Sequence, residues 1–306
     1  MKDLEIIIGW ECNNNCMFCS NPEMKKIMEE KKLPIIDINL IKNILKKEDP
    51  KKIDTLFLVG GEPTIINGLF EIIRFAITLG FKRIFLMTNG RMLSNISFLK
   101  KIIKYPQIEI GISIHSSEEK THDALTRTQG SFKQTVKGIE NLNKTGKKFM
   151  TNTVITKKNY KELPTLIKML SEYNPSIILL SFPFPKGKAK ENFNEIIPRY
   201  SEIKEKIIET LELGKKLNQN VKTLDIPACI LGNYSKQMHE NEITKERFII
   251  THAFDEIIYG KNYGREKIKS EFCKQCKLFK NCEGVWKEYA KIFRFDELNP
   301  IEDKRC

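Results

Sequence analysis

The chain has 306 residues, of which 41% are hydrophobic and 30% are charged, and its formal net charge is +13. This balance excludes a disordered or fibrous protein and is typical of one large domain, alone or with a small one. No apolar stretch approaches the roughly 18 residues that cross a bilayer, and the run at residues 4–10 is too short for a signal peptide, so we expect a cytoplasmic protein with no membrane partner. The positive charge could attract nucleic acid, an acidic peptide or an acidic redox partner. Because the lysines are scattered over expected helix and loop surfaces, an ordinary solvated surface is the stronger interpretation, and a nucleic-acid partner is not expected.

Apolar runs rich in β-branched residues predict six strands, at residues 4–9, 55–59, 83–88, 108–115, 149–156 and 177–184. Segments with helical spacing lie between them. Strands that are apolar on both faces are expected in a parallel sheet covered by helices. Six such units predict an α/β fold with a partial (β/α)6 barrel, since a complete eight-unit barrel takes about 250 residues.

The eight cysteines form two groups, one within residues 12–19 and the other between residues 229 and 306. Without a secretion signal, such cysteines argue for a metal, a cluster or catalysis rather than for disulfides. The alternation of strands and helices is lost after about residue 198. We therefore expect a barrel core over residues 1–198, a linking helix over 199–220 and a small cysteine-bearing domain over 221–306.

The first group consists of Cys12, Cys16 and Cys19, on a short loop after the first predicted strand. A single loop that carries three thiolates within eight residues can fold around one metal centre. A [4Fe–4S] cluster held by only three cysteines keeps one iron open, which can bind a substrate or cofactor. A zinc site and a set of buried structural thiols are the alternatives.

The CxxxCxxC spacing of these cysteines, with the aromatic Phe18 directly before the third, resembles the defining motif of the radical S-adenosylmethionine (SAM) superfamily. The resemblance implies a [4Fe–4S] cluster whose open iron binds SAM, with Phe18 next to the cofactor. It also implies an electron donor such as flavodoxin or ferredoxin. SAM would then be cleaved to a 5′-deoxyadenosyl radical that abstracts hydrogen from the substrate.

In that superfamily a Gly-Gly-Glu motif ends the second strand and contacts the amino group of SAM, and Gly60, Gly61 and Glu62 stand in this place. Two glycines allow the backbone to approach a ligand closely, and a carboxylate suits an ammonium group. Thr88 and Asn89 resemble the turn that ends the third strand in the superfamily, and we expect them beside the cofactor.

Further cofactor contacts follow from the resemblance with less specific motifs. Ser113 lies on the fourth predicted strand where relatives contact the ribose or carboxylate, and His115 replaces an acid, which leaves its role open. Arg127 resembles the arginine that pairs with the SAM carboxylate, a pairing suited to its planar fork, although a surface arginine is the alternative. Asn152 and Ser181, on the fifth and sixth strands, are expected near the ribose and adenine.

The second group includes the CxxCxxxxxC pattern of Cys273, Cys276 and Cys282, with Cys229 upstream and Cys306 at the last position. The CxxC pair alone is compatible with zinc. The spacing resembles part of the SPASM domain, or of the shorter twitch domain, of radical enzymes. Because a full SPASM set needs more than these five cysteines, we expect one auxiliary [4Fe–4S] cluster. Cys229 completes the preferred ligand set, and Cys306 could replace it, although terminal residues fray.

These observations favour a radical SAM enzyme that modifies a peptide or a small molecule, for example by oxidation or cross-linking. Two hypotheses from other classes remain open at this stage. One is a non-catalytic electron carrier with two clusters, and the other is a zinc-stabilised protein that binds nucleic acid.

Overall fold

The computed structural model describes residues 2–30, 32, 36–241, 247–250, 258–259, 266–280 and 282–301. Its centre is a curved sheet in which neighbouring strands run parallel and follow one another in chain order. These strands are β1 (Lys2–Ile7), β2 (Ile53–Val59), β3 (Ile84–Thr88), β4 (Ile108–Ser113), β5 (Phe149–Val154), β6 (Ile178–Ser181) and β7 (Val221–Leu224). The predicted partial barrel is confirmed.

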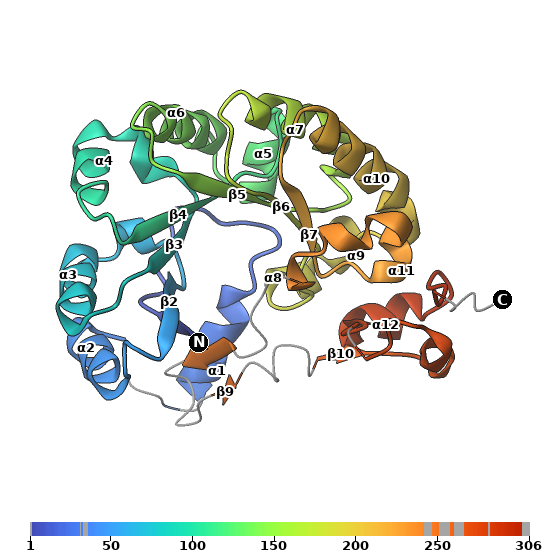
Figure 1. Ribbon diagram of the computed structural model, residues 1–306, viewed down its shortest axis with the longest axis horizontal. Helices are drawn as coiled ribbons and strands as arrows, with labels where there is room; N and C mark the ends of the chain where they lie inside the picture. The colour runs from blue at the N-terminus through green and yellow to red at the C-terminus, as the bar shows by residue number, and fades with distance from the viewer. Residues whose placement is uncertain are drawn as a thin grey trace.

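Helices follow the strands and lie along the outside of the curved sheet, as Figure 1 shows for α2, α3, α4, α6, α7 and α10. The helices are α1 (Asn21–Glu30), α2 (Ile38–Lys47), α3 (Leu69–Leu79), α4 (Ile96–Ile102), α5 (Glu119–Thr126), α6 (Ser131–Asn143), α7 (Leu163–Ser171), α8 (Lys188–Glu191), α9 (Phe193–Ile196), α10 (Tyr200–Lys216), α11 (Ala228–Leu231) and α12 (Lys287–Phe293). Short 3-10 turns are η1 (Pro63–Ile65), η2 (Arg91–Ser94), η3 (Tyr160–Glu162), η4 (Gly232–Gln237), η5 (His239–Asn241) and η7 (Glu271–Gln275).

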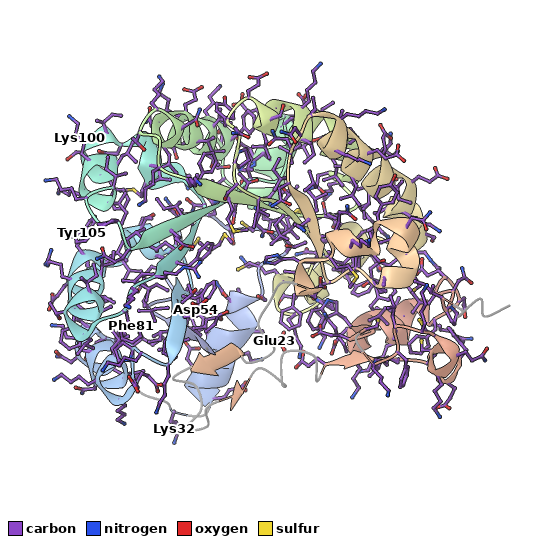
Figure 2. All side chains as sticks on the ribbon, viewed as in Figure 1. Glu23, Lys32, Asp54, Phe81, Lys100 and Tyr105 are labelled. Atoms are coloured by element: carbon purple, nitrogen blue, oxygen red, sulfur yellow. The ribbon has the colours of Figure 1, made fainter. Side chains whose placement is uncertain are left out.

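Alternation along the strands separates the hydrophobic core from the concave face. In β4, Ile108, Ile110 and Ile112 are buried in the core between sheet and helices, so the residues between them lie on the opposite face. A side chain at Gly111 would meet Phe85 at 2.7 Å, which places the two residues on the same concave face. Lys100, on the outer helix α4, lies at the rim of the molecule in Figure 2. The concave face is therefore where a ligand can meet the strand ends.

The sheet contains more strands than the sequence predicted. β7 pairs with β6 at one side, and at the other β8 (Arg247–Ile250) pairs in parallel with β1 and is followed by the antiparallel β9 (Ile258–Tyr259). Both β7 and β8 come from the segment expected to form the C-terminal domain, yet they belong to the barrel sheet. β7 was missed because its four residues, Val-Lys-Thr-Leu, are too few and too polar for an apolar run. The division into domains otherwise stays a prediction.

The C-terminal segment packs against the end of the barrel near α11 (Figure 1). It contains a small antiparallel pair, β10 (Lys267–Ile268) and β11 (Val285–Trp286), followed by α12. The ring of Tyr289 lies 4.6 Å from that of Tyr200, and Tyr200 N donates a hydrogen bond of 2.9 Å to the Tyr289 hydroxyl. Aromatic burial of this kind fixes one unit on another. Among the described helices, none has the length and apolar character to cross a membrane.

Candidate SAM and cluster sites

The loop between β1 and α1 carries Cys12, Cys16 and Cys19. The three thiols lie close enough for their charges to interact, because both Cys19 and Cys12 raise the pKa of Cys16. Burial is the larger cause, and together these effects raise the pKa of Cys16 to about 12. Burial also raises the pKa of Cys12 and of Cys19. The thiols are therefore protonated at neutral pH, and a metal centre must displace their protons on binding.

Three consecutive asparagines between the first two cysteines anchor the loop through their side-chain oxygens. Asn13 Oδ1 accepts a hydrogen bond of 2.7 Å from Asn89 Nδ2, and Asn14 Oδ1 accepts one of 2.8 Å from Arg91 Nη1. Asn15 Oδ1 accepts from Lys188 Nζ. Sequence reasoning missed Arg91 and Lys188, because no local motif marks a residue that reaches the loop from elsewhere in the chain.

The backbone of the loop is also held from two sides. Asn15 N and Met17 N donate hydrogen bonds of 2.9 Å to the carbonyl oxygens of Thr126 and Leu125, at the end of α5. On the other side, Lys188 N donates one of 2.9 Å to Cys19 O. The loop is thus built into the barrel rather than lying free on its surface.

Gly187 is required for this second contact. A side chain there would meet Cys19 O at 2.8 Å, and its φ of +51° favours glycine. Its N–H donates a hydrogen bond of 2.6 Å to Glu23 on α1, which is labelled in Figure 2. The segment that leads into α8 therefore holds both the cysteine loop and α1, the helix that follows this loop.

Gly60 and Gly61 allow a close approach, but to another stretch of backbone. A side chain at Gly60 would meet Gly9 O at 2.2 Å, and one at Gly61 would meet Glu11 O at 2.1 Å. Gly61 N donates a hydrogen bond of 2.8 Å to Gly9 O. These glycines therefore hold the end of β2 against the segment that leads into Cys12.

Glu62 follows them and is 2% exposed. Its Oε1 accepts hydrogen bonds from Thr64 N at 3.1 Å and from the hydroxyls of Thr64 and Thr88 at 2.5 Å, while Oε2 accepts one of 2.7 Å from Asn89 N. Burial raises the pKa of Glu62, although these hydrogen bonds oppose it. Its charge in turn contributes to the raised pKa of Cys12. A fixed carboxylate therefore lies beside the cysteine loop, and a nearby cation would favour its ionised form.

Thr88 and Asn89, expected beside the cofactor, have clear partners within the protein. The Thr88 hydroxyl and the Asn89 N–H both donate to Glu62, and the Asn89 side chain donates to Asn13. Both residues are at least nine-tenths buried. They hold the acid and the cysteine loop in one arrangement.

Phe18 packs edge-on against His115, with the ring centres 4.7 Å apart. His115 is 4% exposed, and its Nδ1 accepts a hydrogen bond of 3.3 Å from Val154 N. The ring of His122 lies 5.6 Å away. Burial, together with His122, holds the pKa of His115 well below its usual range. His115 is thus a neutral residue that links the cysteine loop to β5.

Ser113, Asn152 and Ser181 come together at the ends of neighbouring strands. Ser113 on β4 is paired in register with Asn152 on β5, and Ser181 Oγ on β6 donates a hydrogen bond of 2.5 Å to Asn152 Oδ1. The predicted residues therefore form one polar group on this side of the barrel.

Arg127 ends α5 in a left-handed conformation, with φ at +48°, and its side chain is exposed. Its Nη2 donates a hydrogen bond of 3.3 Å to Asn192 Oδ1, and Asn192 Nδ2 donates one of 3.0 Å to Met17 O. Arg127 therefore lies near the cysteine loop and reaches it through Asn192.

The second cysteine group assembles from two parts of the chain. Cys229 is on α11, whereas Cys273 and Cys276 lie in and after η7 and Cys282 precedes β11. Burial, Cys282, Cys273 and Cys276 together raise the pKa of Cys229 to about 11. The four cysteines line one cavity. Cys306 lies outside the described residues.

The walls of this cavity are mainly apolar and include Ile268, Phe279 and Leu298. Gly284 N donates a hydrogen bond of 3.3 Å to Cys282 Sγ. With φ at +91°, Gly284 also approaches Ile268 O so closely that a side chain would meet it at 2.2 Å. The glycine thus directs an N–H at a sulfur, a contact that tunes the properties of bound metal centres.

Among the described residues, no three His, Cys, Asp or Glu side chains are arranged to hold a single metal ion. Thiolates are the usual ligands of Fe–S clusters. The donor set of thiols in both groups fits Fe–S clusters.

The first cysteine group lies within a segment that matches a known family. A family model described as the radical SAM superfamily matches residues 6–170, more than half of the chain. The chain is 28% identical over 202 residues to the AdoMet-dependent heme synthase of Methanosarcina barkeri. The aligned residues cover 65% of this chain and 56% of that protein. It is 26% identical over 224 residues to a probable GTP 3′,8-cyclase of Saccharolobus islandicus, covering 72% of this chain and 68% of that protein. The chain thus spans little more than half the length of the first relative.

Solved structures share the fold. Streptococcus suis SuiB bound to S-adenosylmethionine has a TM-score of 0.67 at 16% identity, covering 99% of this chain and 76% of SuiB. The anSMEcpe structure with bound AdoMet and Cp18Cys peptide has a TM-score of 0.64 at 16% identity, covering 94% of this chain and 89% of anSMEcpe. The segment matched by the family model contains the cysteine loop and Glu62. This chain belongs to the radical SAM superfamily.

Proposed function

We propose that this protein reductively cleaves SAM to a 5′-deoxyadenosyl radical and abstracts hydrogen from a peptide or a small molecule. Cys12, Cys16 and Cys19 would hold the [4Fe–4S] cluster, which supplies one electron and an iron that is open to the cofactor. The observation that carries the proposal is Glu62, a buried carboxylate fixed beside the cysteine loop.

In this proposal Glu62 accepts the amino group of SAM. The hydroxyl of Thr88 and the backbone N–H of Asn89 hold the carboxylate in place, which reduces the entropy lost on binding. Gly60 and Gly61 set the distance between this acid and the cysteine loop. An ammonium group would also offset the burial of the Glu62 charge.

The remaining contacts of SAM are assigned by position. The polar group of Ser113, Asn152 and Ser181 would meet the ribose and adenine, and Phe18 would shield the cofactor from water. The exposed Arg127 would turn to the SAM carboxylate, which its planar fork matches.

An auxiliary [4Fe–4S] cluster bound by Cys229, Cys273, Cys276 and Cys282 completes the proposal. Four ligands leave no open iron, so this cluster suits electron transfer with the substrate. The apolar walls of the cavity support the assignment, because excluding water protects a cluster and tunes its potential.

Two kinds of substrate are consistent with the relatives. The heme synthase and the GTP cyclase support a small molecule, while a SuiB structure bound to its precursor peptide SuiA supports a peptide. The positive net charge suits an acidic electron donor such as flavodoxin or ferredoxin.

Anaerobic purification, followed by iron and sulfide analysis, tests the proposal. We expect about eight irons per chain, as two clusters require. With SAM and dithionite, we expect 5′-deoxyadenosine to form, and omission of either should abolish it. Two clusters without cleavage of SAM would instead identify an electron carrier, and zinc in place of iron would identify a zinc-stabilised protein.

A further inference from the structure

The three asparagines of the cysteine loop bring two positive charges to it from separate parts of the barrel. Arg91, in the turn after β3, donates to Asn14, and Lys188, at the start of α8, donates to Asn15. Arg91 also donates to the carbonyl oxygen of Asn13 and, through Nε at 2.6 Å, to Gln134 Oε1. Every one of these acceptors is a neutral amide.

A neutral acceptor satisfies a cationic donor without cancelling its charge. Aspartate in place of Asn14 or Asn15 would instead form an ion pair, and the field of the cation would be lost at a short distance. Within the part of the chain that the structure describes, no carboxylate lies in an ion pair with Arg91 or Lys188. Both charges therefore remain available to act on whatever the loop holds.

The two cations reach different parts of the loop. Arg91 donates to Asn13 and Asn14, which follow Cys12, whereas Lys188 donates to Asn15, which precedes Cys16, and its backbone N–H donates to Cys19 O. The two cations thus bind adjacent residues of the loop, and hydrogen bonds hold both of them in place.

We propose that Arg91 and Lys188 are positioning residues that raise the reduction potential of the cluster held by Cys12, Cys16 and Cys19. Reduction adds one negative charge to a cluster that already carries three thiolates, so fixed cations stabilise the reduced form more than the oxidised one. The inference rests on the proposed function, since it requires a cluster at this loop.

The decisive experiment is a redox titration of this cluster followed by electron paramagnetic resonance. The auxiliary cluster is first removed by Cys273→Ala and Cys276→Ala, so that only one signal is followed. In this background Arg91→Gln and Lys188→Gln should each shift the midpoint to more negative potential, and the double variant should shift it by about the sum. Glutamine keeps a donor for the asparagine while it removes the charge.

Lys190 provides the matched control. It lies on α8, two residues beyond Lys188, and its side chain is exposed. Lys190→Gln should leave the midpoint nearly unchanged, because solvent screens an exposed charge. Equal midpoints in Arg91→Gln, Lys188→Gln and Lys190→Gln proteins with full iron content would overturn the proposal.

Variants that keep the charge separate an electrostatic role from a purely structural one. Arg91→Lys and Lys188→Arg keep the cation but change the geometry of its hydrogen bonds, so their midpoints should stay near that of the parent protein. Midpoints as negative as those of the glutamine variants would show that the two residues act only by fastening the loop, which contradicts the proposal. A parent protein that binds no iron at this loop would instead count against the proposed function, so the two failures are distinguishable.

Discussion

The Thr88 hydroxyl donates a hydrogen bond of 2.5 Å to Glu62 Oε1, and it thereby joins the ends of β2 and β3 beside the cysteine loop. The next residue, Asn89, extends the connection, since its backbone N–H binds Glu62 and its side chain binds Asn13. The acid and the loop are therefore parts of one hydrogen-bonded network. A ligand that binds between them meets groups that are already in place, which lowers the entropic cost of binding.

Replacing Glu62 with glutamine should weaken SAM binding about 10-fold to 100-fold, because a hydrogen bond to a charged group contributes about 1.5–3 kcal/mol. The amide also replaces one acceptor oxygen by an N–H₂ donor, which would face the backbone N–H of either Asn89 or Thr64. Calorimetric titration of the reconstituted protein with SAM measures the change.

Glu11 supplies the control for this variant. It lies on the cysteine loop, directly before Cys12, and its side chain is exposed. Glu11→Gln should bind SAM like the unmodified protein. Wild-type affinity in Glu62→Gln, with full iron content, would refute the role of Glu62 as the ligand of the amino group.

The two cysteine groups should lose their clusters independently. Changing Cys12, Cys16 and Cys19 to alanine should abolish formation of 5′-deoxyadenosine and halve the iron, because the second group lies on α11 and the C-terminal segment. Changing Cys273 and Cys276 to alanine should remove only the iron of the auxiliary cluster and leave SAM cleavage in place. Loss of all iron in both variants would show that the sites depend on each other.

A comparison of Cys229→Ala with Cys306→Ala tests the ligand set of the auxiliary cluster. Cys229 shares a cavity with Cys273, Cys276 and Cys282. We therefore expect Cys229→Ala to lose the auxiliary cluster and Cys306→Ala to keep it, as measured by iron content and the visible spectrum. The opposite result would assign the fourth ligand to Cys306.

The sequence could predict those features that are encoded in short, continuous segments. The cysteine loop and Glu62 were found because each belongs to a motif of a few consecutive residues. The six strands were found because each contains a run of apolar residues. β7 was missed since only Val221 and Thr223 of its residues are buried. It is a strand because it pairs with β6, and a pairing partner cannot be seen in so short a segment.

Contacts between distant residues could not be predicted in the same way. Arg91 meets Asn14 across 77 positions of the sequence, and Lys188 meets Asn15 across 173. Nothing near either cation in the sequence distinguishes it from the other basic residues. These contacts form only in the folded protein, because the carboxyl ends of the parallel strands β1, β3 and β6 lie on the same side of the barrel.

The buried histidines should make stability depend on pH. His122 Nδ1 accepts a hydrogen bond of 3.2 Å from His115 N, and burial lowers the pKa of His122 to about 4 from 6.5. Between these values the unfolded chain binds a proton that the folded protein does not, so stability is full above pH 6.5 and falls as the pH decreases toward 4. We expect a loss of about 2 kcal/mol from His122 between pH 7.5 and 5.

Urea unfolding at several pH values measures this loss. His122→Phe removes the titrating group, so its unfolding free energy should change less over this range than that of the unmodified protein, even though the variant is less stable at pH 7.5. Both proteins share the other titrating groups, including the buried Glu62, so the difference between their curves isolates His122. Parallel curves for the two proteins would contradict the assignment.

Lys267 should be essential for holding the C-terminal segment on the barrel. Its side chain is 3% exposed, and Nζ lies 2.5 Å from both Asp225 Oδ1, just after β7, and Glu283 Oε2. Burial alone would lower the pKa of Lys267, but the two carboxylates outweigh it and raise the pKa. Lys267→Met leaves Asp225 as a buried charge without its cation, which should cost about 3–5 kcal/mol.

Chemical unfolding and limited proteolysis of the C-terminal segment measure the effect. Lys291→Met, at an exposed position on α12, is the control and should be nearly neutral. Adding Asp225→Asn to Lys267→Met removes the unpaired charge, so the double variant should regain part of the lost stability. If Lys267→Met were no less stable than Lys291→Met, the ion pair would not be what fastens the two parts, and the aromatic contact of Tyr200 with Tyr289 would have to account for their packing.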